Sequence, residues 1–195
     1  MQQRANDGLL RASEDIFYEL WMLRRLRDMV LALPDHEVPE DEVREAERSA
    51  YTHTTHFEAH FWPSQPSRPN PPPERFVVEH NALVEAFALH SRVLIEFFYA
   101  KPNPKFPDDV HAEHYFSPGS TWRNARPKLS KEDYEGIKNR VGKEIAHLTF
   151  ARQLVAPEDK PWPISWISGI IDEAATAFVS LVDMNLIHPL LRGAS

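Results

Sequence analysis

The stretch from Glu79 to Tyr99, EHNALVEAFALHSRVLIEFFY, constrains the fold more than any other part of the chain. It contains no Gly or Pro and is long enough for about six helical turns at 3.6 residues per turn. A helix with a narrow polar face belongs in the middle of a bundle, where neighbouring helices cover most of its sides. On a helical wheel the polar positions of this stretch form one narrow stripe: Asn81, Glu85, Arg92 and Glu96.

The other helix-compatible segments predict several further helices. Residues 9–33 have apolar positions at helical spacing, with Ser13 or Asp15 as a start cap and Pro34 as the end. Residues 40–61 form a second, more polar candidate behind Pro39. Residues 130–155 predict a helix that begins with a Ser-x-x-Asp capping box. Residues 164–187 predict a last helix with a broad apolar face, which Pro189 ends.

The connections between these segments are rich in proline, and no segment has the alternating pattern of a strand. Residues 63–73 contain six prolines in eleven positions, which excludes a helix or central strand. We interpret them as an extended connecting loop, although they could also be a docking motif for a partner protein. Residues 108–116 predict a short helix capped by an Asp. The segment after it is predicted to be a loop, and Trp122 is expected to anchor that loop to the bundle. The sequence therefore predicts an all-α helical bundle of four to five main helices with proline-rich connections, as one domain over residues 1–195.

Composition limits the classes of partner. The chain has a hydrophobic fraction of 42%, a charged fraction of 26% and a net charge of −7, which argue against coating of nucleic acid or anionic membrane by bulk charge. The absence of cysteine excludes disulfides and thiolate metal sites. The first residues lack a signal-peptide pattern, and no apolar run approaches the roughly 18 residues of a membrane span. We expect a cytoplasmic protein without a membrane partner.

Two sets of polar residues on the predicted helices have alternative interpretations. Arg24, Arg25 and Arg27 lie near the end of the first helix, where cations suit the helix dipole. They are predicted to be solvated, with an anion site as the alternative. His90 lies opposite the polar stripe and faces the core. It is predicted to be a structural histidine bonded to a carbonyl or carboxylate, with a role in a site as the alternative.

The segment NRVGKEIAH, Asn139 to His147, carries the strongest catalytic pattern. On an α-helix, Arg140 and His147 lie within about 20° of each other and about two turns apart, with Lys143 between them. A cation that holds a phosphate and an imidazole that moves a proton are what metal-free RNA cleavage by the 2′-hydroxyl needs.

The motif from Arg140 to His147, in a helical bundle of this size, resembles the HEPN superfamily of small helical proteins, many of which are ribonuclease toxins or phage-defence effectors. The resemblance implies a metal-independent ribonuclease that acts on RNA as a homodimer. In it His147 would be the general acid/base and Arg140 and Lys143 would bind phosphate, with His90 or Asn139 assisting. The pieces HSRVLIEFFY and KEIAHLTFAR also resemble a group of bacterial helical proteins.

Two other functions remain open. The chain could be a non-catalytic helical interaction module that binds a protein partner through residues 63–73 or an exposed bundle face. It could also bind a divalent metal through clustered histidines. No Gly-rich phosphate loop, nucleotide fingerprint or Ser-His-Asp order is present, so we predict no cofactor. The histidine clusters considered for a metal are His53, His56 and His60, and Asp109, His111 and His114.

Overall fold

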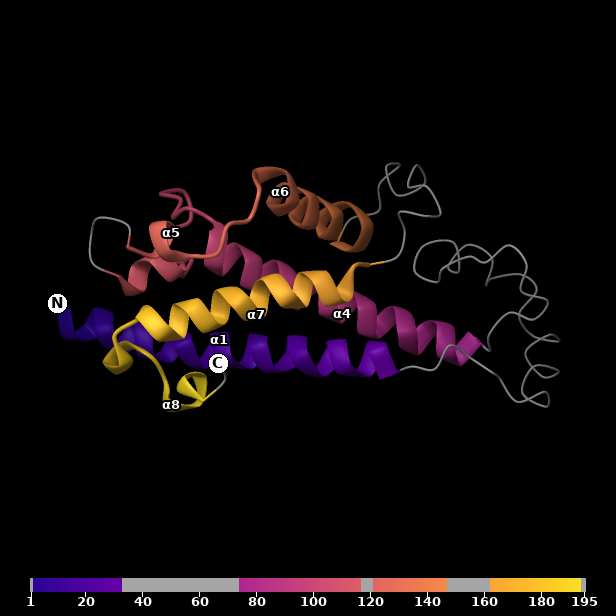
Figure 1. Ribbon diagram of the computed structural model, residues 1–195, viewed down its shortest axis with the longest axis horizontal. Coiled ribbons are helices and arrows are strands. Elements are labelled where there is room, and N and C mark those ends of the chain that lie inside the picture. The colour runs from indigo at the N-terminus through magenta and orange to yellow at the C-terminus, as the bar shows by residue number, and fades with distance from the viewer. Residues whose placement is uncertain (1, 33–73, 117–120, 147–161, 194–195) are drawn as a thin grey trace.

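The computed structural model describes residues 2–32, 74–116, 121–146 and 162–193, and these form an all-α fold without strands (Figure 1). This confirms the predicted fold class. The predicted helix at 40–61 and the proline-rich segment 63–73 lie outside the described residues. The α-helices are α1 (Gln2–Ala32), α4 (Glu74–Tyr99), α5 (Thr121–Ala125), α6 (Lys131–Arg140), α7 (Ile164–Leu181) and α8 (Pro189–Arg192), and the shorter elements are the 3₁₀ helices η1 (Ala112–Tyr115) and η5 (Met184–Leu186) and the π-helix η2 (Val141–Ala146).

Helix α4 occupies the centre of the bundle, as its narrow polar stripe predicts. It packs against α1, α7, α6, η1 and η2. Figure 1 shows α1 and α4 running in opposite directions, with α7 lying lengthwise alongside them and α6 on the side of α4 away from α1. Helix α4 ends at Tyr99, as expected. The end is capped by Arg126, whose Nη1 donates to the carbonyls of Phe98 and Tyr99 at 3.1 and 2.9 Å; these carbonyls have no partner within the helix.

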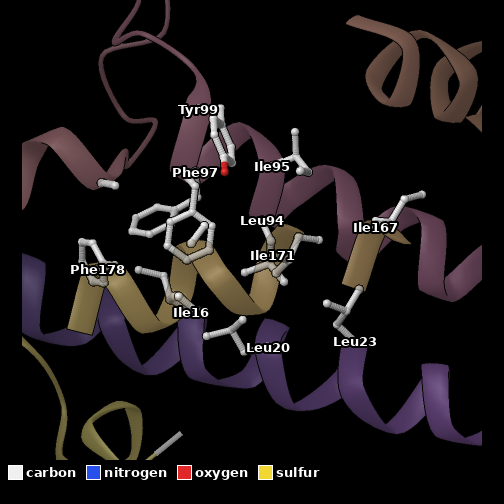
Figure 2. Close-up of a cluster of buried hydrophobic side chains, with 14 of the residues drawn as sticks. Ile16, Leu20, Leu23, Leu94, Ile95, Phe97, Tyr99, Ile167, Ile171 and Phe178 are labelled. Atoms are coloured by element: carbon white, nitrogen blue, oxygen red, sulfur yellow. The ribbon is translucent and has the colours of Figure 1, made fainter. Parts of the chain in front are cut away.

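The core lies between α1, α4 and α7, and Figure 2 shows side chains from all three helices meeting there. Phe178 of α7 is central, because its ring contacts those of Phe97, Phe98 and Trp122 at centroid distances of 5.4 to 5.9 Å. Burial of each such large apolar side chain contributes roughly 1.5–3 kcal/mol. The residues of this core at the centre of the bundle include Ile16, Leu20, Leu23, Leu94, Phe97, Ile167, Ile171 and Phe178, all at most 7% exposed.

Trp122 anchors the segment after α4, as predicted. Its side chain is fully buried, and its Nε1 donates to the carbonyl of Phe98 at 2.7 Å. Its ring stacks on Phe116 at 5.9 Å with an interplanar angle of 12°. The prediction of an irregular loop around this residue is wrong in part, because Thr121–Ala125 is the short helix α5.

Two predicted helix ends differ from the structure. Helix α1 begins at Gln2, so Ser13 and Asp15 are inside the helix rather than at its start. The Ser13 hydroxyl donates to the Leu10 carbonyl at 2.6 Å and accepts the His188 backbone N–H at 2.7 Å. It therefore connects α1 to the C-terminal segment instead of capping α1.

The last long helix ends at Leu181, six residues earlier than predicted, and Pro189 begins α8 instead of closing a helix. Val182 is already extended, and Asp183 caps η5 by accepting the Asn185 N–H at 2.9 Å. The chain turns here so that Ile187 reaches the core, where it is fully buried. Tertiary packing thus overrides a helical pattern that continues in the sequence.

Helix α6 begins as its capping box predicts, because the Ser130 hydroxyl accepts the Asp133 N–H at 2.9 Å. The core side also agrees, since Ile137 and Val141 are buried. The winding changes after Arg140, where the α-helix gives way to the π-helix η2. The rest of the predicted helix, from residue 147 to about 155, lies outside the described residues.

Candidate functional site

The predicted nuclease residues lie at the end of α6 and in η2. Asn139 and Lys143 are exposed, and Arg140 is half-buried. The Arg140 guanidinium lies over the indole of Trp162, 4.5 Å from the ring centroid, a cation–π contact that holds its stem against the bundle. His147 lies outside the described residues, so its position relative to Arg140 stays a prediction.

The π-helix changes the spacing rule on which the Arg140 and His147 motif depends. A π-helix closes hydrogen bonds between residues i and i+5 and therefore turns less per residue than an α-helix. Side chains that are spaced to share one face of an α-helix therefore do not share one face along Val141–Ala146. Single π turns are frequent at functional sites. Arg92 of α4 approaches η2, since its Nη1 lies 3.9 Å from the position that a Cβ would occupy on Gly142.

His90 pairs with a carboxylate, in agreement with its predicted structural role. Its Nδ1 lies 2.6 Å from Oε2 of Glu19 on α1, and its side chain is 17% exposed. The ring of Tyr18 contacts the imidazole edge-on at 6.1 Å. The structure does not bring His90 together with Arg140 or Lys143. His90 faces α1, whereas Arg92, about 200° away around α4, faces the end of α6.

The polar stripe of α4 is only partly exposed to solvent. Arg92 and Glu96 form the predicted i, i+4 pair at 3.3 Å, and Lys138 of α6 approaches Glu96 at 3.9 Å. Asn81 is 3% exposed, and its amide nitrogen and oxygen have no hydrogen-bond partner among the residues that the structure describes. The prediction that Asn81 faces solvent is therefore wrong, because the bundle encloses the N-terminal part of the stripe.

The arginines at the end of α1 bind a carboxylate of α7. Arg24 Nε lies 2.7 Å from Oδ1 of Asp172, and Arg27 Nη1 lies 3.1 Å from Oδ2 of the same residue. Arg25 is exposed. Neither interpretation from the sequence, solvated charges or an anion site, describes Arg24 and Arg27, which connect two core helices.

The segment around His111 does not form a metal centre in the part of the chain described. The expected Asp cap is wrong: His111 precedes η1, and the Nδ1 of His114 accepts the His111 backbone N–H at 3.2 Å. The two imidazoles lie 5.5 Å apart. Burial, and then the neighbouring His111, lower the pKa of His114. No three His, Asp or Glu side chains among the described residues could hold a metal ion together, and His53, His56 and His60 lie outside them.

The surface feature that sequence reasoning missed is an apolar face on α1 and α4. The face consists of Tyr18, Met22 and Met29 on α1 and of Val78, Ala82, Leu89 and Val93 on α4, and we call it the α1–α4 face. It borders the polar stripe of α4, and the contact of Tyr18 with His90 joins its two halves. Five of its side chains are about half exposed: Tyr18 51%, Met29 51%, Val78 60%, Leu89 46% and Val93 49%.

The signal for this face was present in the sequence. Tyr18, Met22 and Met29 recur at helical spacing, as do Val78, Ala82, Leu89 and Val93. The sequence predicts that neighbouring helices cover most sides of α4, and it does not indicate which apolar positions stay exposed. Soluble proteins rarely leave so many neighbouring large apolar side chains open to water, and such patches mark sites of interaction.

Helix α7 passes a length and composition test for a membrane span, in contrast to the prediction that no segment approaches one. Its 18 residues, Ile164–Leu181, have a mean hydropathy of 1.3. Core helices of soluble proteins pass the same test. Ile167, Ile171 and Phe178 of α7 are buried against α1 and α4, and 44% of the helix is buried in the bundle.

No family model matches the chain, and no curated protein or solved structure matches it. The resemblance of Arg140–His147 to the HEPN superfamily therefore stays a prediction.

Proposed function

We propose that this chain is a non-catalytic helical interaction module that binds a protein through the α1–α4 face. The exposure of five large apolar side chains on two adjacent helices carries this proposal. Each gains roughly half of the 1.5–3 kcal/mol of full burial when a partner covers it. Because association itself costs several kcal/mol in lost translational and rotational freedom, the expected binding is weak.

The arrangement of the face suits a helical partner. Its two rows of side chains follow antiparallel helices that pack against each other in the bundle. An amphipathic helix recognises such a surface through apolar positions at i, i+3, i+4 and i+7. Methionine is common at interaction surfaces because its unbranched side chain adapts to different contacts, and the face contains Met22 and Met29.

Site-specific photo-crosslinking tests the proposal. A benzophenone amino acid replaces Leu89 in one variant and Leu190 of α8 in the control, because the two side chains have similar exposures of 46% and 51%. After irradiation in cells that express the protein, we expect a protein adduct from position 89 and none from position 190. Adding Val93→Glu should remove the adduct. Equal adducts from both positions, or none from position 89, would contradict the proposal.

A second candidate is the metal-independent ribonuclease, which the two neighbouring cations Arg140 and Lys143 support. Lys143 is exposed on a π turn, and the Trp162 ring holds Arg140 directly before it. Two cations at a local change of winding could bind the phosphates of RNA. His147 would supply the general acid/base, as the HEPN resemblance implies.

The ribonuclease is tested by RNA cleavage in EDTA with wild-type protein, Arg140→Ala and His147→Ala. Loss of cleavage in both variants, with retained helical content by circular dichroism, would support the enzyme. Cleavage that is equal in all three proteins would indicate a contaminating nuclease. No cleavage by the wild-type protein would leave the interaction module as the better account.

A further inference from the structure

We draw no further inference here: the strongest candidate, the exposed apolar side chains of the α1–α4 face, carries nothing beyond the proposed interaction because nothing in the structure shows what covers them.

Discussion

The hydrogen bond from Trp122 to the end of α4 gives a prediction that can be worked out in detail. Trp122→Ala removes a fully buried indole from contacts with Phe98, Phe116 and Phe178. Replacement of a buried Trp by Ala costs about 3–5 kcal/mol, from lost transfer free energy and the cavity left behind. Because the total free energy of unfolding of a domain is about 5–15 kcal/mol, this variant should be close to the limit of folding.

Trp122→Phe separates the hydrogen bond from the packing. Phenylalanine retains most of the ring contacts but cannot donate to the Phe98 carbonyl. That carbonyl keeps a donor, because Arg126 Nη1 also binds it at 3.1 Å. The variant therefore loses only about 1 kcal/mol of net hydrogen bonding and about 1–2 kcal/mol of packing.

A double-mutant cycle with Arg126→Ala is the sharp test. When both donors are removed, the Phe98 carbonyl at the end of α4 has no remaining partner, and an unsatisfied buried carbonyl costs about 1–3 kcal/mol. Urea denaturation should show that the double variant loses about 1–2 kcal/mol more than the sum of the single variants. Additive losses, or a Trp122→Phe loss equal to that of Trp122→Ala, would refute this account of the anchor.

Three further predictions concern other parts of the bundle. Asn81→Leu should raise the free energy of unfolding by about 1–3 kcal/mol, because it removes a buried amide that no other described residue hydrogen-bonds; urea denaturation measures this. Asp172→Asn should lower the free energy of unfolding by about 1–2 kcal/mol. This loss is smaller than that expected for a deeply buried ion pair, because the Asp172 side chain is 31% exposed. The pKa of His114 is lower in the folded protein than in the unfolded chain, where it is near 6.5. The stability that the neutral His114 contributes should therefore be complete above pH 6.5 and be lost as the pH falls below that value. His114→Gln should flatten this part of a stability profile measured from pH 7.5 to 5.

Each of these predictions has a clear opposite result. A destabilised Asn81→Leu protein would mean that the amide makes interactions that its surroundings do not indicate. An Asp172→Asn protein as stable as the wild type would mean that Arg24 and Arg27 contribute nothing to the contact of α1 with α7. A stability profile that does not change with His114→Gln would assign acid sensitivity to another group.

Local pattern was sufficient for much of the fold. The uninterrupted apolar stretch ending at Tyr99 and the Ser130 capping box depend on neighbours in the sequence, and the structure has both where they were predicted. The end of α7 did not follow from pattern, because the early turn after Leu181 serves the burial of Ile187 and the bond of His188 to Ser13. These contacts join residues at opposite ends of the chain.

The partners of the polar side chains likewise could not be predicted from local sequence pattern. A carboxylate partner for His90 was expected, but its identity as Glu19 required knowledge of how α1 aligns with α4. The pairing of Arg24 and Arg27 with Asp172 likewise joins residues more than a hundred positions apart. The change to π winding after Arg140 has no known signature in the sequence, and the nuclease motif was spaced for an α-helix.

Oxidative footprinting with hydroxyl radicals tests the central claim, that the α1–α4 face docks a protein, without any substitution. Met29 on the face and Met184 on η5 are 51% and 44% exposed, so they should oxidise at similar rates in dilute purified protein. In cells that express the protein, we predict that oxidation of Met29 falls several-fold while oxidation of Met184 does not change. Equal oxidation of the two methionines under both conditions would contradict the claim that the α1–α4 face binds a partner.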